Sequence, residues 1–419
     1  MDQALRSKRA QFALMVMFFT QGMASLSWMP RIPEFINNLQ VSNEVWGSIL
    51  GFGGAGAILP LVFTNKLVLR FGTTPIIKYS AIAIAIIDSV LPLATHWWVF
   101  LVLHFIMSIA FSTFNIALNS QAVAFQKRQG KVLLGSFHGA WSIGAATSAA
   151  ISAVIASYTP LLIHTLSLGV ICLGLFLWSA SNMLTPEEDN HGQERDSGSK
   201  VSWFKTPKYL WLLSIGTFAG MWPELVIMDW SSVYGKKVLL LDAGSAALPY
   251  TCFIVAMIFG RFSIVNLTEK YQIARLSQIG GAFGSIALAL AIFTSANLAT
   301  SNQPLALLLL CLFFAIAGYG ISSMVPGFYS ATGHIDGLST AQALSRMALF
   351  NYTIIIFAKM LMGSLIDNTS LPLAMIFPIA MFAFASVASG FVASRNKKTA
   401  RVDTLAYPPT SPITEIDVP

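Results

Sequence analysis

Residues 304–328 read PLALLLLCLFFAIAGYGISSMVPGF, an apolar run that contains no charged side chain. A helix crosses the roughly 30 Å hydrocarbon core of a bilayer with about 20 apolar residues, so this run predicts a membrane-spanning helix. Similar runs recur along the whole sequence, at residues 10–30, 43–64, 74–94, 97–121, 132–157, 159–182, 208–233, 243–265, 273–296, 304–328, 340–365 and 371–394. We therefore predict an all-α membrane protein with 12 transmembrane helices.

The composition also indicates a membrane protein, since 55% of the residues are hydrophobic and only 10% are charged. The net charge of +7 is compatible with nucleic-acid binding, but the lysine and arginine residues stand at the ends of apolar runs and form no basic stripe. The three cysteines each lie inside an apolar run, which disfavours a disulfide framework. We expect no nucleic-acid partner, no metal and no cofactor.

The distribution of positive charge predicts the orientation in the membrane. If both termini are cytoplasmic, 20 of the 25 lysine and arginine residues, Arg261 among them, fall on the cytoplasmic side. Cytoplasmic loops retain such an excess. The first apolar run continues to Trp28 without a cleavage site, which favours a retained helix over a signal peptide. We predict a multi-pass protein of the plasma (inner) membrane with both termini in the cytoplasm.

A charged segment, TPEEDNHGQERDSGSK at residues 185–200, separates the runs into two sets of six. We predict an N-terminal six-helix bundle at 1–182, a cytoplasmic linker at 183–207, a C-terminal six-helix bundle at 208–394 and a disordered cytoplasmic tail at 395–419. The first span contains QGM at 21–23 and the seventh contains AGM at 219–221, at matching depths. This likeness indicates a distant repeat, and hence two pseudo-symmetric bundles.

The stretch GFGGAG at residues 51–56 matches the G-x-G-x-x-G pattern of dinucleotide-binding turns. It follows no strand and lies inside a membrane span, so we interpret its glycines as sites of close helix packing. Gly135 and Gly139 receive the same interpretation.

Two bundles of six spans joined by a long loop resemble the major facilitator superfamily. The family's signature loop lies between the second and third spans and reads NKLVLRFGTTP here, at residues 65–75. Arg70 and Gly72 match that signature and are candidate gating residues. Leu69 stands in place of the expected acid, and Thr73 and Thr74 stand in place of basic residues.

Four further stretches resemble a bacterial branch near the fucose permeases, whose members often have no assigned substrate. They are SWMPRIPEF, SFHGAWSIG, ELVIMDWSSVY and GYGISSMVPGFYSATG. The eleventh span departs from that branch at Asn351, Ile354, Ala358 and Lys359, where the branch usually has three glycines and a proline. The fifth span lacks the Gly-Pro pattern that is common in drug/proton antiporters.

A charged side chain in mid-bilayer costs about 2.5–3.5 kcal/mol on insertion scales, so charged and polar groups within spans are candidate functional residues. Our candidates for substrate or proton binding are Glu224, His138, Trp141, Asp229, Arg346, Asn115 and Tyr352. Our candidates for gating or structural roles are Arg31, Glu34, Arg70, Gly72 and Lys359.

Several of these residues have a second interpretation. Glu224 is also compatible with an interhelical hydrogen bond, Asp229 with an interfacial anchor, and His138 with a hydrogen bond near the cytoplasmic gate. Arg346 would bind a substrate anion or neutralise a carboxylate, and Arg31 with Glu34 would form a local pair at the rim. Lys359 in mid-span would need a carboxylate or the loss of its proton. A bridge between Asp88 and His104 is a further hypothesis.

The stretch MWPELVIMDWSS at residues 221–232 carries two acids. Glu224 and Asp229 are five residues apart, so a helix separates them by about 140° and about 7.5 Å along its axis. Pro223 removes a backbone hydrogen bond, which predicts a kink or break near residues 220–223. We expect Glu224 to lie in a central cavity and Asp229 to lie nearer the outer mouth.

The expected function is secondary active transport of a small polar solute, sugar-like or an organic acid, by alternating access in a monomer. The expected partners are this solute, protons as the coupling ion, and the lipid bilayer. The alternatives are efflux of a drug or metabolite, or a transport-derived sensor without flux. An enzyme is disfavoured because the sequence contains no HExxH motif, no GxSxG motif and no paired His/Asp cluster.

Overall fold

The computed structural model describes residues 3–130, 133–185, 188, 206–335 and 340–406. The first half of the chain consists of α1 (Gln3–Leu26), η1 (Met29–Arg31), α2 (Ile32–Leu39), α3 (Asn43–Gly54), η2 (Ala55–Ile58), α4 (Pro60–Phe71), α5 (Thr73–Val90), η3 (Leu91–Leu93), α6 (Trp97–Gln129), α7 (Leu134–Ile155) and α8 (Leu161–Ala180). The second half consists of α9 (Lys208–Lys237), α10 (Ala243–Leu267), α11 (Ile273–Leu298), α12 (Gln303–Ile321), α13 (Met324–Ser330), η5 (Ala331–His334), α14 (Thr340–Asn368), α15 (Leu371–Ala374) and α16 (Ile376–Ala406).

Among the described residues, eleven helical segments are long and apolar enough to cross a membrane. The remaining long helix, α7, has 22 residues and is rich in glycine, alanine and serine, which lowers its hydropathy. It is packed closely against α1, because a Cβ atom on Gly22 or Gly144 would overlap a backbone carbonyl oxygen of the other helix. The predicted all-α fold with 12 membrane helices is therefore confirmed.

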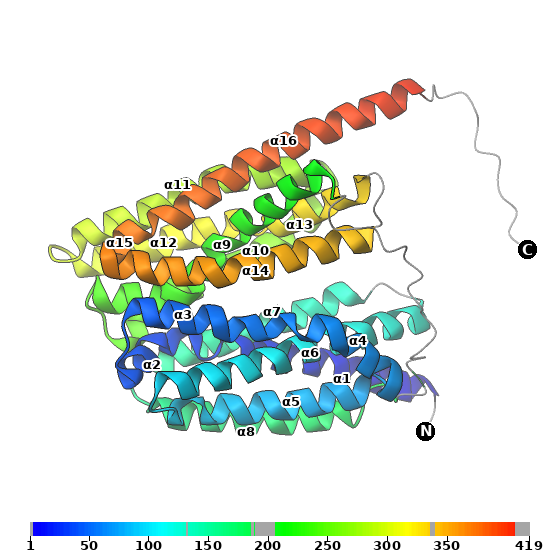
Figure 1. The fold of residues 1–419 in the computed structure, drawn as a ribbon, viewed down its shortest axis with the longest axis horizontal. Coiled ribbons are helices and arrows are strands. Elements are labelled where there is room, and N and C mark those ends of the chain that lie inside the picture. The colour runs from blue at the N-terminus through cyan, green and yellow to red at the C-terminus, as the bar shows by residue number, and fades with distance from the viewer. Residues whose placement is uncertain (1–2, 131–132, 186–187, 189–205, 336–339, 407–419) are drawn as a thin grey trace, which may run out of the picture.

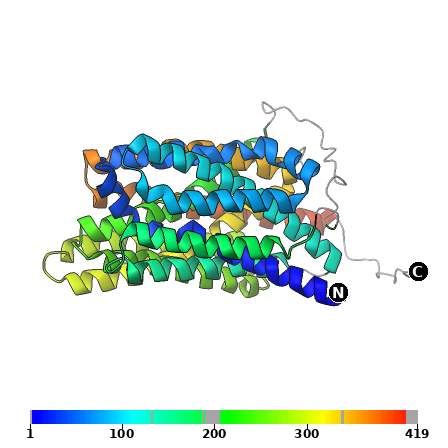
Figure 2. The same ribbon diagram turned by 90° about the horizontal axis from the view of Figure 1, so that it is seen from below.

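The two halves of the chain lie side by side as two helical layers, blue to cyan and green to red in Figure 1. Helix α1 begins and α16 ends at the same end of the molecule in both views (Figure 1, Figure 2). We call this the termini end and the opposite one the far end. Helix α16 continues to Ala406, so the stretch 395–406, which was predicted to be disordered, is helical. The linker segment 189–205 and the residues after 406 lie outside the described residues.

Polar contacts join the two halves at the far end. Asp367 of α14 accepts hydrogen bonds from Asn43 Nδ2 at 2.6 Å and from the backbone N–H of Glu44 at 2.7 Å, both at the start of α3. Lys237 Nζ donates to Asn43 Oδ1 at 3.0 Å. We call these contacts, together with a hydrogen bond from Ser157 to Asp242, the far-end latch.

Asp242 caps the start of α10 and contacts Ser157, which follows α7 in the other half. Its Oδ1 atom accepts hydrogen bonds from Ser157 Oγ at 2.7 Å and from the backbone N–H groups of Gly244 and Ser245 at 2.9 and 3.2 Å. Hydrogen bonds from the Ser245 hydroxyl and the Ser157 hydroxyl lower the pKa of Asp242 to about 2. The carboxylate therefore stays ionised, and keeps these contacts, at any pH above about 4.

Small residues bring α3 and α14 together beside the latch. A Cβ atom on Gly47 would lie 2.5 Å from the carbonyl oxygen of Lys359, and one on Gly51 would lie 2.6 Å from that of Ile356. Toward the termini end, α14 diverges from α3 and α4 (Figure 1). The close contact at Gly51 supports the interpretation of the GFGGAG glycines as packing sites. A Cβ atom on Gly135 would meet no atom within 4 Å, so the packing interpretation was wrong for Gly135.

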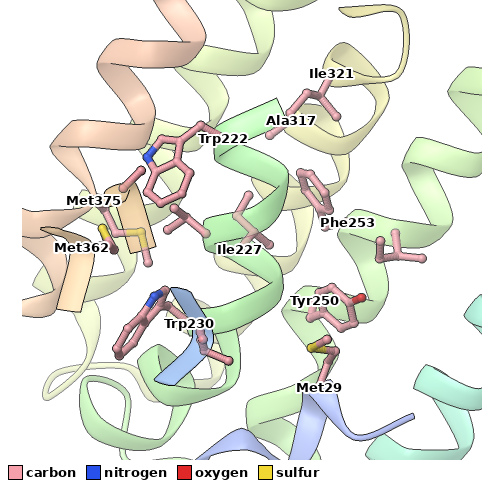
Figure 3. Close-up of a cluster of buried hydrophobic side chains, with 14 of the residues drawn as sticks. Met29, Trp222, Ile227, Trp230, Tyr250, Phe253, Ala317, Ile321, Met362 and Met375 are labelled. Atoms are coloured by element: carbon pink, nitrogen blue, oxygen red, sulfur yellow. The ribbon is translucent and has the colours of Figure 1, made fainter. Parts of the chain in front are cut away.

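Helix α9 runs through the core of the second half and is one continuous helix through Pro223, so of the predicted kink or break the break does not occur. Trp222 and Trp230 lie on one side of α9, beside Met362 and Met375 (Figure 3). Both tryptophans are buried, so these aromatic neighbours of the two acids form part of the core. The close packing around α9 fixes the directions in which its two carboxylates leave the helix.

Candidate functional site

Glu224 and Asp229 project from α9 toward different helices, as their spacing predicts. Glu224 pairs with Arg261 of α10, with 3.7 Å between Oε1 and Nη2. Asp229 pairs with Lys359 of α14, with 2.7 Å between Oδ2 and Nζ. The two acids therefore belong to two separate ion pairs.

The Asp229–Lys359 pair is buried, with the two side chains 2% and 13% exposed. Counted from the ends of α9 and α14, both residues lie about 12–14 Å inside the far end. That depth and burial do not fit the interpretation of Asp229 as an interfacial anchor. The sequence predicted that Lys359 in mid-span would need a carboxylate or the loss of its proton, and Asp229 provides that carboxylate. The other carboxylate oxygen, Asp229 Oδ1, has no hydrogen-bond partner among the described residues.

The Glu224–Arg261 pair is far more accessible, with 26% of Glu224 and 41% of Arg261 exposed. Its 3.7 Å separation is longer than a charge-assisted hydrogen bond of about 2.7–2.9 Å. Besides Glu224, Arg261 contacts the sulfur of Met257 at 3.6 Å. The two charges attract each other and leave room around the guanidinium.

The predicted span of residues 243–265 contains Arg261, although the count of positive charges assigned this residue to the cytoplasmic side. Arg261 lies in α10, within the membrane-spanning segment Ala243–Ile264. Helix α10 continues past Arg261 to Leu267. Pro and Gly are absent from the six residues after Arg261, and this absence was the signal that the helix continues.

His138 comes from α7, in the other half of the protein, and is exposed. Its ring meets Phe18 edge-on, with 5.3 Å between the ring centroids. A Cβ atom on the next residue, Gly139, would lie 3.7 Å from the ring of Phe262, and the charge of Arg261 acts on the His138 ring. Glu224, Arg261 and His138 thus form a cluster of ionisable side chains to which both halves contribute.

Four other candidates lie in different surroundings. Trp141 is half-buried where α7 packs on α1, and Tyr352 is exposed. Asn115 is exposed and accepts a hydrogen bond from Asn119 Nδ2 at 2.7 Å. Arg346 is buried and donates to Thr206 Oγ1 at 2.7 Å. It lies 13 residues before Lys359 on α14, about 20 Å nearer the termini end.

Arg31 and Glu34 form the predicted local pair, in which Arg31 is buried and Glu34 is partly exposed. Both Arg31 Nε and Nη2 donate to the Glu34 carboxylate, the latter at 2.7 Å. Nη2 also donates to the carbonyl of Thr159 at 2.8 Å, and Nη1 lies 3.3 Å from His164 Nδ1. With 1% of its side chain exposed, Arg31 is a satisfied structural residue.

The signature loop between α4 and α5 is held by neutral groups. Gly72 has a φ of 81° and a ψ of 169°, a conformation that favours glycine, and its N–H donates to Val68 O at 2.8 Å. Gln121 Nε2 donates to the hydroxyls of Thr73 and Thr74, each at 2.7 Å. Arg70 is exposed, with its guanidinium carbon 5.1 Å from the centre of the adjacent Phe71 ring.

The hypothetical bridge between Asp88 and His104 does not form. Among the described residues, Asp88 Oδ1 and His104 Nδ1 each lack a hydrogen-bond partner. His104 packs against Trp28 instead, with 5.9 Å between the ring centroids.

A pocket of about 650 Å³ opens at the far end, lined by both halves. Pro30, Pro33, Glu34, Ile36, Asn37, Gln40, Val41 and Ser42 line it from the first half, and Val233, Lys236, Lys237, Ala243 and Ala246 line it from the second. Its size is that of a small-molecule site.

Known proteins resemble this chain over nearly its whole length. An uncharacterized transporter, y4wD, of Sinorhizobium fredii (strain NBRC 101917 / NGR234) is 24% identical over 370 residues, which cover 87% of this chain and 93% of that protein. A point mutant of the nucleoside transporter NupG has a similar structure, with a TM-score of 0.73, 12% identity, and coverage of 91% of this chain and 99% of that one. A D-xylose-proton symporter has a TM-score of 0.66, 14% identity, and coverage of 91% and 96%.

At these identities the two solved structures show the fold alone. The model of the Major Facilitator Superfamily matches residues 12–337, well over half of the chain. With twelve membrane helices in two halves, this protein is therefore a member of the Major Facilitator Superfamily, a multi-pass secondary transporter of a small solute and not an enzyme.

Proposed function

We propose that this transporter moves a small polar solute, sugar-like or an organic acid, across the plasma membrane by alternating access, with protons as the coupling ion. The observation that carries the proposal is the cluster of ionisable side chains Glu224, Arg261 and His138, to which both halves contribute. Both termini in the cytoplasm, a monomeric state and a place in the branch near the fucose permeases belong to the same proposal.

The inter-half contacts support alternating access. The far-end latch and the close packing of α3 on α14 hold the halves together at the far end, and α14 diverges from α3 and α4 toward the termini end. The count of positive charges predicts that the termini end is cytoplasmic. In our proposal the structure is therefore the state that receives or releases solute on the cytoplasmic side.

The accessibility of the cluster supports proton coupling. Glu224 is partly exposed and His138 is exposed, so both can exchange protons with water that enters between the halves. Carboxylates and histidines in membrane spans often mark proton paths. The buried Asp229–Lys359 pair has a structural role in this proposal, because its two charges already neutralise each other.

Uptake into proteoliposomes tests the proposal. Labelled sugars, organic acids and nucleosides would be offered with and without an imposed pH gradient, to the wild type and to Glu224→Gln. We expect the gradient to drive accumulation of a hit in the wild type, and Glu224→Gln to abolish that accumulation while it remains folded. Glu269→Gln, which alters an exposed carboxylate after α10, is the matched control and should behave like the wild type.

Equal accumulation with and without the gradient would contradict proton coupling. Gradient-driven export in place of uptake would favour efflux, and ligand binding without flux would favour the sensor.

A further inference from the structure

We infer that the solute is a small anion of the carboxylate class and that Arg261 binds it in place of Glu224. This inference rests on the proposed transport function and names its substrate class.

Arg261 has unused hydrogen-bonding capacity. A guanidinium carries five N–H donors in a planar fork that suits a carboxylate. Among the described contacts, Arg261 donates to a thioether sulfur at 3.6 Å and faces Glu224 at 3.7 Å, beyond hydrogen-bond distance. Arg31 provides the contrast within the same protein, since it binds Glu34 through two nitrogens and is 1% exposed. Arg31 is fully engaged, whereas Arg261 can accept a ligand.

The direction of the Arg261 side chain argues against an ordinary interfacial arginine. Arg261 lies 18 residues from the start of α10, about 27 Å from the far end, while Glu224 lies about 20 Å from the far end on α9. The guanidinium reaches Glu224, so it extends toward the middle of the membrane. An interfacial arginine would extend toward the nearer membrane surface, where its charge is hydrated. Holding the charge inward is costly unless it serves a ligand or a partner.

The exchange of partners balances charge. Before binding, Arg261 and Glu224 neutralise each other. When an anion takes Arg261, Glu224 loses its cation and takes up one proton from water on a carboxylate oxygen. The cluster is neutral before and after, so one anion and one proton move together without net charge.

The other titratable groups around the cluster do not upset this balance. His138 faces Arg261 from α7, and Tyr250 of α10 lies within the electrostatic reach of both Glu224 and Asp229. A tyrosine hydroxyl is neutral near pH 7 and an imidazole is mostly neutral, since their ordinary pKa values are about 10 and about 6.5. Asp229 has its own counter-ion in Lys359 at 2.7 Å.

The far-end pocket carries charge of the appropriate sign for the same class of solute. Its charged lining residues are Glu34, Lys236 and Lys237, and Glu34 is already paired with Arg31. The two lysines therefore leave the pocket positive, which raises the local concentration of anions.

Paired ligands that differ only in charge test the inference. Binding to the purified protein would be measured by calorimetry with lactate against lactamide, benzoate against benzamide, and glucuronate against glucose. We expect at least one carboxylate to bind about tenfold or more tightly than its neutral partner, as expected for loss of a charge-assisted contact. Arg261→Gln should remove that preference. Arg275→Gln, an exposed arginine on α11, is the matched control.

Proton uptake on binding tests the exchange itself. In weak buffer, the wild type should take up about one proton per bound carboxylate, as the charge balance requires. Glu224→Gln should bind the carboxylate and take up none. In proteoliposomes, uptake of the anion should respond to a pH gradient and should not respond to a potassium diffusion potential with valinomycin.

Preference for the neutral ligand, failure of every carboxylate to bind, or an Arg261→Gln variant that keeps the preference would overturn the inference. If Arg261→Gln does not fold, Arg261→Lys provides the test. Lysine keeps the positive charge but loses the planar fork of N–H donors, so carboxylate binding should still weaken. Unchanged carboxylate binding by Arg261→Lys would count against the inference. Gradient-driven uptake of neutral sugars would overturn it and leave the proposed function standing. Carboxylate binding with proton uptake but no flux would leave the inference standing and remove the proposed function.

Discussion

Replacing Lys359 with methionine leaves the carboxylate of Asp229 buried without its cation. The two charged atoms lie 2.7 Å apart, and the side chains are 2% and 13% exposed, so solvent screens the pair very little. The loss of one partner of a buried pair costs about 3–5 kcal/mol, against about 0–1 kcal/mol for a surface pair. Methionine keeps most of the lysine stem, so the expected loss of about 3–5 kcal/mol is electrostatic and not a packing loss.

A variant that lacks both charges distinguishes the contribution of the ion pair to stability from that of its surroundings. Asp229→Asn alone leaves a buried ammonium group, and it should be about as costly as Lys359→Met. The double variant leaves no buried charge, so it should recover most of the lost stability. We expect a coupling energy of about 2 kcal/mol or more from the double-mutant cycle.

Thermal unfolding of the purified proteins in detergent, followed by size-exclusion chromatography, measures these differences. Lys66→Met is the matched control, because Lys66 is exposed on α4 and its loss should change stability by less than about 0.5 kcal/mol. If Lys359→Met unfolds at the same temperature as Lys66→Met, or if the double variant shows only the sum of the two single losses, the ion pair is not what stabilises this region.

Two further predictions concern the far end. Gly47→Leu should prevent closure of the far end, since even a Cβ atom on Gly47 would lie 2.5 Å from a backbone oxygen of α14. Gly54→Leu is the control, since a Cβ atom on Gly54 of the same helix would meet no atom within 4 Å. The distance between spin labels at Asn38 and Ser301, measured in a background without native cysteines, should increase in Gly47→Leu and stay unchanged in Gly54→Leu. Equal distances in the two variants would show that close packing at Gly47 does not control closure of the far end. Asp242→Ala should cost about 1 kcal/mol as a lost helix cap. This difference in stability should be constant from pH 5 to 8 and should shrink as the pH falls below 4 toward the pKa of about 2. The reason is that protonation of Asp242 removes the same contacts from the wild type. A difference in stability that varies between pH 5 and 8 would contradict this assignment.

The sequence predicts the fold well because membrane spans are encoded locally. Each membrane span must satisfy its own backbone, so the apolar runs located the helices, and they did so even for α7, whose glycine, alanine and serine residues lower its hydropathy. The predicted span of residues 243–265 ends within two residues of the end of α10, but Arg261 was counted as a cytoplasmic charge because it stands near the end of that run, where the bias of positive residues normally places one. The helix continues to Leu267, and that continuation puts a cation into the membrane.

Partners that lie far apart in the chain could not be predicted. Asp229 and Lys359 were each recognised as costly, but only the packing of α14 against α9 joins them. Similarly, His138 and Arg261 come from different halves, and no spacing rule relates them. What the sequence did provide was the geometry within one helix, and the separation of Glu224 from Asp229 follows from it.

The two ion pairs of α9 differ in the property that decides their roles. The Glu224 pair is loose and exposed, so a ligand can replace one partner without burying an isolated charge. The Asp229 pair is tight and buried, so neither partner can leave without a large cost. One helix therefore carries both an exchangeable contact and a fixed one.

The fixed pair lies where the halves meet. The carbonyl oxygen of Lys359 forms part of the surface against which Gly47 packs, so the residue that ties α14 to α9 also positions α14 against α3. If the ion pair holds α14 in place for closure, Lys359→Met should lengthen the distance between labels at Asn38 and Ser301 as well as lower stability. The double variant with Asp229→Asn should restore both. A variant that loses stability without a change in that distance would show that the pair supports the fold of the second half alone and has no part in closing the far end.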